Sequence, residues 1–292
     1  MSQFSKFEWE RRNYPPLAQW VYLDHPSSGL IPQEGYRQMQ AYLSDRLQNA
    51  HSYEDYISNW RFADALRVQL GQMIGAGGDD IAYGYNSSQL MNVFINGLGL
   101  TPNDNVVIPE LAYDASRYAL LNQQAHGVEI RFAKHHQYAT TSQALFSLVD
   151  EHTKAIVVSH VEHGFGYRYD LSELGAFCRK NGIWLAVDAT QSCGVMQLDV
   201  TGMQVDFLAV SCYKWLQSYL GNAFAYISPD LRKTLQLCDA GWTGVVDRFH
   251  CDFEPLYSQS ARRFECGGLN FAGLHSLKVS VESYLRLGGP DI

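Results

Sequence analysis

The sequence has no run of like charges, no apolar stretch long enough to span a membrane, and no Cys-x-x-Cys pair. Its 22 basic and 30 acidic residues give a net charge of −8, which argues against nucleic acid and against an anionic membrane surface as partners. Neither a Gly-x-Gly-x-x-Gly motif after a strand nor a P-loop lysine is present, so a nucleotide-binding domain ranks low. The six cysteines lack metal-ligand spacing and predict reduced, mostly buried thiols in a cytoplasmic protein, at positions 178, 193, 212, 238, 251 and 266.

What the sequence does contain is enough apolar material for a sizeable core. Hydrophobic residues make up 46% of the 292 residues, which suits one large α/β domain or one large and one small domain. Short apolar runs bounded by polar residues or glycine predict strands that are covered on both faces. These runs are Asn105–Ile108, Val128–Phe132, Ala155–Ser159, Ile183–Val187, Phe207–Val210 and Ala223–Ile227.

Amphipathic segments lie between these runs, for example Ser87–Leu98 and Leu171–Lys180. The alternation predicts an α/β fold with a mostly parallel sheet of about seven strands and helices on both faces. We expect residues 1–59 to form an N-terminal arm or helical segment and residues 60–240 to form the large domain. Residues 241–292 are then the end of that domain and a linker.

Polar residues follow three of the predicted strands at their carboxyl ends, where open α/β sheets bind ligands. The three sets are residues 159–163 (SHVEH), 188–191 (DATQ) and 211–214 (SCYK). Because parallel strands end at the same edge of a sheet, we expect the three sets to converge.

Asp188 and Lys214 are the residues in these sets that indicate a specific chemistry. Taken singly, a lysine after a strand is more often a solvated charge, and an aspartate there more often caps a helix. At neighbouring strand ends the two together favour pyridoxal chemistry. The lysine forms an imine with the cofactor and then shuttles protons at the substrate α-carbon, while the carboxylate keeps the pyridine nitrogen protonated.

Residues 183–227, with Asp188, Gln191 and Lys214, resemble the signature region of class V aminotransferases. This group of fold-type I enzymes includes cysteine desulfurases, selenocysteine lyases, kynureninases and isopenicillin N epimerase-like proteins. The resemblance implies a pyridoxal 5′-phosphate (PLP) cofactor and makes residues 60–240 the PLP-binding large domain. It implies that Lys214 is the Schiff-base lysine, that Asp188 is the pyridinium partner, and that Gln191 donates a hydrogen bond to the phenolic oxygen of the cofactor.

Other positions match the cofactor's remaining contacts in the family. Ser87 and Ser88 match a turn that opens a helix, and the N-terminus of a helix is a ready phosphate site. The resemblance makes them phosphate ligands together with Ser211 and Tyr213; the simpler alternative for the two serines is N-capping. Tyr113 matches an aromatic or histidine ring that stacks on the cofactor.

Further matches point to a homodimer with its cofactor site near the interface. In relatives, the regions that correspond to Trp242, Thr243 and Asn270 reach the cofactor phosphate of the partner subunit. His163 replaces an asparagine or small polar residue; its imidazole either contacts substrate or cofactor, or is packed in the protein.

Besides His163, the sequence departs from the family in three ways. Serines replace the threonines of the phosphate turn, and the turn 267–270 (GGLN) lacks a hydroxyl that the family places there. The chain ends at Ile292, where relatives continue, so we expect a truncated or absent small domain. That domain normally carries the arginine for the substrate carboxylate and, in desulfurases, the nucleophilic cysteine. No cysteine here matches that nucleophile, which disfavours cysteine desulfurase activity.

The sequence therefore predicts a PLP-dependent enzyme that acts on an amino acid through an external aldimine. The expected reaction is that of an aminotransferase or of a C–S or β-eliminating lyase. A catalytically degenerate PLP-binding or scaffold member of the same family is the alternative. No metal, nucleic-acid partner or membrane association is expected.

Overall fold

The computed structural model describes residues 6–250 and 253–289 of the chain. The helices are α1 (Lys6–Arg11), α2 (Gln33–Gln48), α3 (Tyr53–Met73), α4 (Ser87–Gly97), α5 (Asp114–Gln124), α6 (Ser142–Phe146), α7 (Leu171–Asn181), α8 (Pro229–Thr234) and α9 (Phe271–Leu287). The strands are β1 (Ile81–Gly84), β2 (Asn105–Pro109), β3 (Glu129–Ala133), β4 (Thr153–Ser159), β5 (Trp184–Asp188), β6 (Phe207–Ser211) and β7 (Ala223–Ile227). Every strand and helix predicted from the sequence is present within two residues of its expected bounds; β1 was not predicted.

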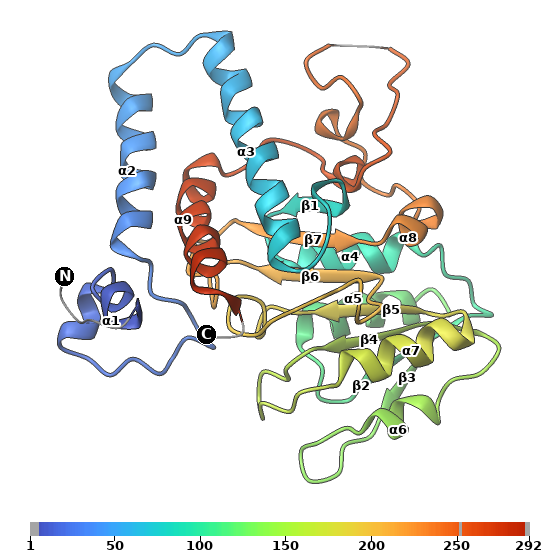
Figure 1. Ribbon diagram of the computed structural model, residues 1–292. Helices are drawn as coiled ribbons and strands as arrows, with labels where there is room; N and C mark the ends of the chain where they lie inside the picture. Colours follow the sequence, from blue (N-terminus) through green and yellow to red (C-terminus); the bar gives the residue numbers. More distant parts are fainter. Residues whose placement is uncertain (1–5, 251–252, 290–292) are drawn as a thin grey trace.

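The strands form one sheet in the order β1-β7-β6-β5-β4-β2-β3 (Figure 1). Strands β2 to β6 run parallel to one another, whereas β7 is antiparallel to both β6 and β1. The prediction of a mostly parallel sheet of about seven strands is confirmed. Because β3 and β4 lie on opposite sides of β2, the sheet order reverses next to β2, and such a reversal is where ligands of open α/β sheets bind.

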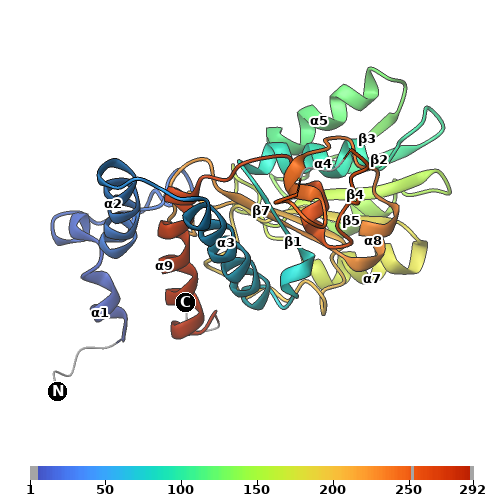
Figure 2. The ribbon, with the colours of Figure 1, turned by 90° about the horizontal axis from the view of Figure 1, so that it is seen from above.

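Two apolar cores lie on opposite faces of the sheet because successive side chains of a strand point to opposite faces. Val107 and Leu185 belong to the core under α3, α7 and α9, whereas Val106 and Ala186 belong to the core under α4 and α5. Figure 2 shows these two groups of helices on either side of the sheet. The two-sided covering explains why the strands read as continuous apolar runs.

The ends of the helices follow from local sequence. Asn86 caps α4, since its side chain accepts a hydrogen bond from the backbone N–H of Gln89. Asp170 caps α7 in the same way, and Gly182 ends that helix in the left-handed conformation with φ of 68°. Both caps hold the preceding loops at the sheet edge where the polar sets lie.

Part of the N-terminal segment packs against the rest of the chain. Helix α2 packs along α9, and α3 continues past residue 59 to Met73 and joins the core with Leu66 and Leu70 (Figure 1). The division at residue 59 thus falls within a continuous helix, and the predicted domain limits stay a prediction. Among the described residues, no helix combines the length and apolarity that crossing a lipid bilayer requires.

Candidate active site

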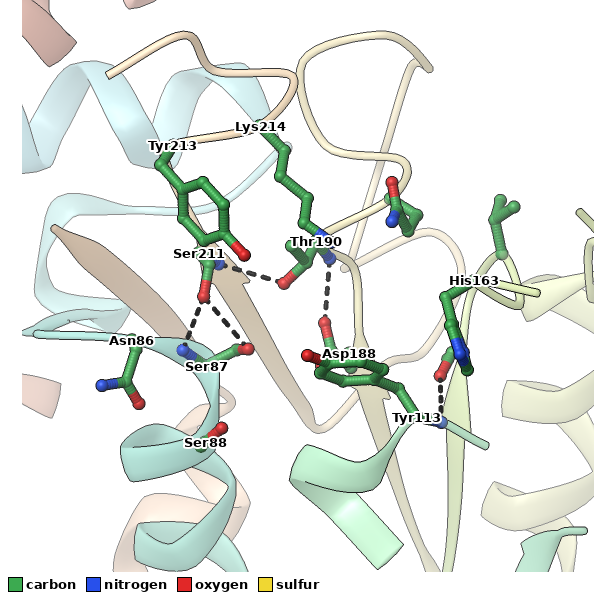
Figure 3. Close-up of a pocket in the computed structure, with 13 residues that line it drawn as sticks. Asn86, Ser87, Ser88, Tyr113, His163, Asp188, Thr190, Ser211, Tyr213 and Lys214 are labelled. Carbon is green, nitrogen blue, oxygen red and sulfur yellow. Dashed lines mark hydrogen bonds between the residues drawn. The ribbon is translucent and has the colours of Figure 1, made fainter. Parts of the chain in front are cut away.

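A pocket opens at the carboxyl ends of the central strands and at the start of α4 (Figure 3). The three polar sets do converge there, as the sheet topology requires. The lining residues are Asn86, Ser87, Ser88, Tyr113, Ser159, Val161, His163, Asp188, Thr190, Gln191, Ser211, Tyr213 and Lys214.

Lys214 lies in the loop after β6, with only 8% of its surface exposed. Burial lowers the pKa of its amine, and the nearby carboxylate of Asp188 opposes that effect. The Lys214 Nζ atom lies 5.7 Å from the centroid of the Tyr113 ring and 5.8 Å from that of the Tyr213 ring. A partly desolvated lysine between two aromatic rings has the environment of a nucleophilic amine.

Asp188 ends β5 and is 4% exposed. Its Oδ1 atom accepts a hydrogen bond of 2.9 Å from the Thr190 N–H, but its Oδ2 atom has no hydrogen-bond partner among the described residues. Burial raises the pKa of this carboxyl, while Thr190 and Lys214 lower it. A buried carboxylate oxygen without a donor is costly. The protonated ring nitrogen of PLP is the kind of donor it needs, so this residue fits the cofactor.

The start of α4 supplies the donors that a phosphate needs. Ser211 Oγ accepts from the Ser87 N–H at 2.8 Å and donates to Ser87 Oγ at 3.1 Å (Figure 3). Asn86 provides the side-chain cap of α4, so capping does not account for Ser87 and Ser88. Together with Ser211, these hydroxyls at the N-terminus of α4 form a cradle that fits the phosphate of PLP.

Gln191 reaches the pocket but is held by other parts of the chain. Its Nε2 atom donates to the Pro26 carbonyl at 3.0 Å, and its Oε1 atom accepts from Trp215 Nε1 at 2.9 Å. The second N–H of the amide stays available for the phenolic oxygen that the sequence analysis expects it to contact. These bonds connect the site to the arm that precedes α2.

Gly29 brings the same arm against the lysine loop. Its N–H donates to the Tyr213 carbonyl at 2.9 Å. A Cβ atom at this position would lie 1.9 Å from the Lys214 carbonyl oxygen, so only glycine allows the close approach. The arm therefore helps to fix the backbone that carries Lys214.

Tyr113 and His163 stand together at the mouth of the pocket (Figure 3). Their rings meet edge to face with centroids 5.0 Å apart, and the Tyr113 N–H contacts Ser159 Oγ at 3.4 Å. Tyr113 is 37% exposed and His163 is also exposed. Both rings are therefore accessible to a ligand. This exposure favours the interpretation in which His163 contacts substrate or cofactor over the one in which it is packed in the protein.

Trp242, Thr243 and Asn270 do not line this pocket within the chain. Trp242 packs edge to face on Trp60, with centroids 5.3 Å apart. Thr243 is fully buried and donates to the Glu265 carbonyl, and Asn270 caps α9. Their expected contacts across a dimer interface stay a prediction.

Thr190, Asn86 and Ser159 line the pocket although the sequence analysis gave them no role. Thr190 donates its N–H to Asp188 and accepts from the Ser211 N–H with its hydroxyl at 3.1 Å. The sequence signal that could have identified Thr190 was its position two residues after Asp188. Thr190 therefore links the carboxylate to the phosphate cradle.

The described cysteines lie outside the pocket lining. Cys178, Cys193 and Cys212 are buried, whereas Cys238 is exposed and Cys266 is partly exposed. Cys251 lies outside the described residues. Three of the five described thiols are thus buried, in agreement with the expectation of mostly buried thiols. No three His, Cys, Asp or Glu side chains of the described residues gather in a group that could hold a metal ion.

Known proteins resemble this chain over most of its length. The family model described as aminotransferase class-V matches residues 21–289. A probable cysteine desulfurase of Methanothermobacter thermautotrophicus is 28% identical over 98% of this chain and 72% of its own length. The kynureninase of Pseudomonas fluorescens is 25% identical over 91% of this chain and 65% of its own length. The chain thus spans about two thirds to three quarters of these two relatives.

Solved structures share the fold. The apo structure of a cysteine desulfurase from Thermococcus onnurineus superposes with a TM-score of 0.86 at 22% identity, over 99% of this chain and 73% of that chain. A C-DES mutant with glycine covalently linked to its PLP cofactor superposes with a TM-score of 0.87 at 19% identity, over 95% of this chain and 74% of that chain. The pocket offers a lysine, an unpartnered carboxylate oxygen and a phosphate cradle at the sheet edge where that cofactor fits. This chain belongs to the class-V aminotransferase family and is a PLP-dependent enzyme of the transferase or lyase type.

Proposed function

We propose that this enzyme breaks a bond at the α- or β-carbon of an amino acid, as an aminotransferase or as a C–S or β-eliminating lyase. The observation that carries the proposal is the unpartnered Asp188 Oδ2 atom in the same pocket as the partly desolvated Lys214 amine. A scaffold that binds no cofactor would have no need to keep a carboxylate oxygen buried without a donor, since that arrangement is destabilising.

When bound, PLP supplies an aldehyde that condenses with amines and a ring that accepts an electron pair from the α-carbon. Lys214 then has two tasks. Its amine would hold the cofactor covalently, and the same amine would take or return the proton at the substrate α-carbon. The lowered pKa of Lys214 favours the neutral amine that both tasks need.

The other lining residues hold and orient the ring. Asp188 would keep the ring nitrogen protonated. The start of α4, with Ser87 and Ser88, binds the phosphate, assisted by Ser211 and the Tyr213 hydroxyl. Tyr113 would stack on the ring, and Gln191 would donate its remaining N–H to the phenolic oxygen.

His163 is the described residue that we assign to the substrate. It is exposed at the mouth beside Tyr113, where an imidazole can hydrogen-bond a carboxylate or another polar group. No cysteine of the described residues lines the pocket, so a persulfide-forming thiol is not part of it. We therefore place desulfuration behind transamination and β-elimination.

A panel of amino acids tests the reaction type. PLP-loaded protein is titrated with each amino acid while its visible absorbance is followed, and the products are identified. We expect at least one amino acid to change the spectrum and to yield a keto acid or an elimination product. A yellow protein whose spectrum responds to no amino acid would instead support the degenerate binding member of the family.

Ser87→Ala combined with Ser88→Ala is expected to weaken cofactor binding by about 1–3 kcal/mol, because each hydroxyl loses a hydrogen bond to a charged phosphate. Equilibrium dialysis against PLP measures the change. Ser172→Ala, at an exposed position in the first turn of α7, is the matched control and should leave the affinity unchanged. Unchanged affinity in the double variant would contradict the phosphate role.

We propose a homodimer in the cytoplasm. Apolar side chains of the arm before α2 are widely exposed in the single chain: Trp20 by 68%, Val21 by 85% and Leu23 by 83%. A partner subunit covering them would also bring its Trp242 region toward the pocket, as the family resemblance implies. Sedimentation equilibrium measures the oligomeric state of the protein, and a monomer at micromolar concentration would contradict the proposed dimer.

The free thiols agree with a reducing compartment such as the proposed cytoplasm.

A further inference from the structure

Glu162 is a buried acid next to the pocket to which the mechanism above gives no task. It lies in the turn after β4, and only 2% of its surface is exposed. The backbone of this turn is fixed, because the Glu162 N–H donates to the Tyr167 carbonyl and the Glu162 carbonyl accepts from the Gly166 N–H, both at 2.9 Å. Its neighbours Val161 and His163 line the pocket, whereas Glu162 is buried behind them.

Glu162 and Asp188 place two carboxyl groups in one buried region. Strands β4 and β5 pair Ser159 with Asp188, and the His160 N–H donates to the Asp188 carbonyl at 2.9 Å, which sets the turn against the end of β5. Both carboxylate oxygens of Glu162 and the Oδ2 atom of Asp188 lack a hydrogen-bond partner among the described residues. Because buried carboxylates without hydrogen-bond donors are costly and the charge of Asp188 acts on Glu162, a proton on one of the two groups removes much of that cost.

The surroundings decide which carboxyl holds it. Asp188 accepts from the Thr190 N–H and faces the Lys214 amine, both of which favour its charged form. Burial is the largest effect on Glu162, and together with the charge of Asp188 it raises the pKa of Glu162 to about 7 despite the hydroxyls of Tyr169 and Ser159. These surroundings favour protonation of Glu162.

No cation faces Glu162 among the groups that act on it. Burial lowers the pKa of His160, which comes just before this turn, to about 4, so its imidazole is neutral at neutral pH. Burial also raises the pKa of the Tyr169 phenol, which stays neutral. The amine of Lys214 lies on the pocket side and acts through Asp188. Glu162 thus has only Asp188 as a charged partner.

We propose that Glu162 is a neutral carboxylic acid in the resting protein and a positioning residue for Asp188. With Glu162 neutral, Asp188 is the one carboxylate that faces the ring nitrogen, a role that rests on the proposed function. Loss of the Glu162 proton as the pH rises through neutrality places a second negative charge behind the ring. The cofactor's electronic environment thereby changes with pH through a group that touches neither substrate nor cofactor.

The first test uses the protein without cofactor and the variant Glu162→Gln, a neutral isostere. A group whose pKa is raised by folding makes the folded state less stable as pH rises from the unfolded pKa to the folded one. Between about pH 5 and about pH 7, the folding equilibrium constant of Glu162→Gln, divided by that of wild type, should rise about tenfold per pH unit. Above about pH 7 this ratio should stay constant. Urea unfolding of both proteins at each pH measures this ratio.

The control is Glu151→Gln, which removes a glutamate at an exposed position. Its unfolding curves should follow those of wild type at every pH. If the curves of Glu162→Gln also run parallel to wild type, the proposal is overturned. Should Glu162→Gln fail to fold, infrared spectra of wild type with ¹³C-labelled glutamate replace it. A protonated carboxyl band at about pH 6 supports the proposal, and its absence overturns it.

The second test uses PLP-loaded protein. The visible spectrum of wild type should change with an apparent pKa near neutrality, and the spectrum of Glu162→Gln should lack that change. If both proteins titrate alike, the positioning role is wrong even where the unfolding result stands. If wild type binds no PLP at all, the proposed function fails while the unfolding test still decides the protonation of Glu162.

Discussion

Lys214→Ala should abolish covalent attachment of PLP and lower turnover by at least about 10²-fold, the minimum typical of a lost acid–base group. The expected loss is large because one amine has both tasks: it attaches to the aldehyde and moves the proton at the α-carbon. No other lysine lines the pocket among the described residues, so no neighbouring amine can replace it. Absorbance spectroscopy of dialysed protein and steady-state kinetics measure the two effects.

Lys233→Ala is the matched control, since Lys233 is exposed and paired with Asp230 on α8. This variant should keep the visible absorbance band and normal turnover. Persistence of the band in Lys214→Ala would contradict the assignment of Lys214. Retention of PLP by dialysis-resistant but non-covalent binding would not contradict it, because the α4 cradle and Tyr113 remain intact.

Asp188→Asn should leave PLP bound but lower turnover by about 10²–10³-fold, the range for loss of a preorganised electrostatic contact. The amide keeps the shape of the side chain and can still accept from the Thr190 N–H. It carries no charge to keep the ring nitrogen protonated, so the ring loses its capacity to accept electrons. Kinetics and cofactor absorbance measure the separate effects.

The same variant should be more stable than wild type when PLP is absent. Burial raises the pKa of Asp188 in the folded state, so its ionised form destabilises the fold at neutral pH, and the amide removes that penalty. Urea unfolding of the cofactor-free proteins measures the change, with Asp239→Asn at an exposed position as the control. Normal turnover, or a cofactor-free Asp188→Asn that is less stable, would contradict the role given to Asp188.

The fold was predictable because its central strands are covered on both faces. Such strands read as short continuous apolar runs, and the runs that became β2 to β7 were found in this way. Strand β1 was missed for a physical reason. It has four residues, IAYG, and its only partner is the antiparallel β7, so it lies at an edge and gives too short a pattern.

The site was predictable where its residues follow strand ends. Asp188, Ser211 and Lys214 lie within three residues of a strand end, so the sheet alone brings them together. Contacts made by distant segments were not predictable. The hydrogen bond from Gln191 to the Pro26 carbonyl joins residues far apart in the sequence, and no local sequence pattern predicts it.

Glu162 illustrates a second limit. The sequence placed it in a polar set after β4, but only the geometry of the turn decides which members of the set face the pocket and which are buried. Charge and burial were therefore needed to separate a residue that contacts a ligand, such as His163, from one that acts through Asp188.

Borohydride reduction followed by peptide mapping tests the central claim most directly. PLP-loaded protein is reduced, digested and analysed by mass spectrometry for a pyridoxyl group. We predict a stoichiometric adduct on the peptide that contains Lys214. An unmodified Lys214 in protein that holds PLP, or an adduct on another lysine, would contradict the account.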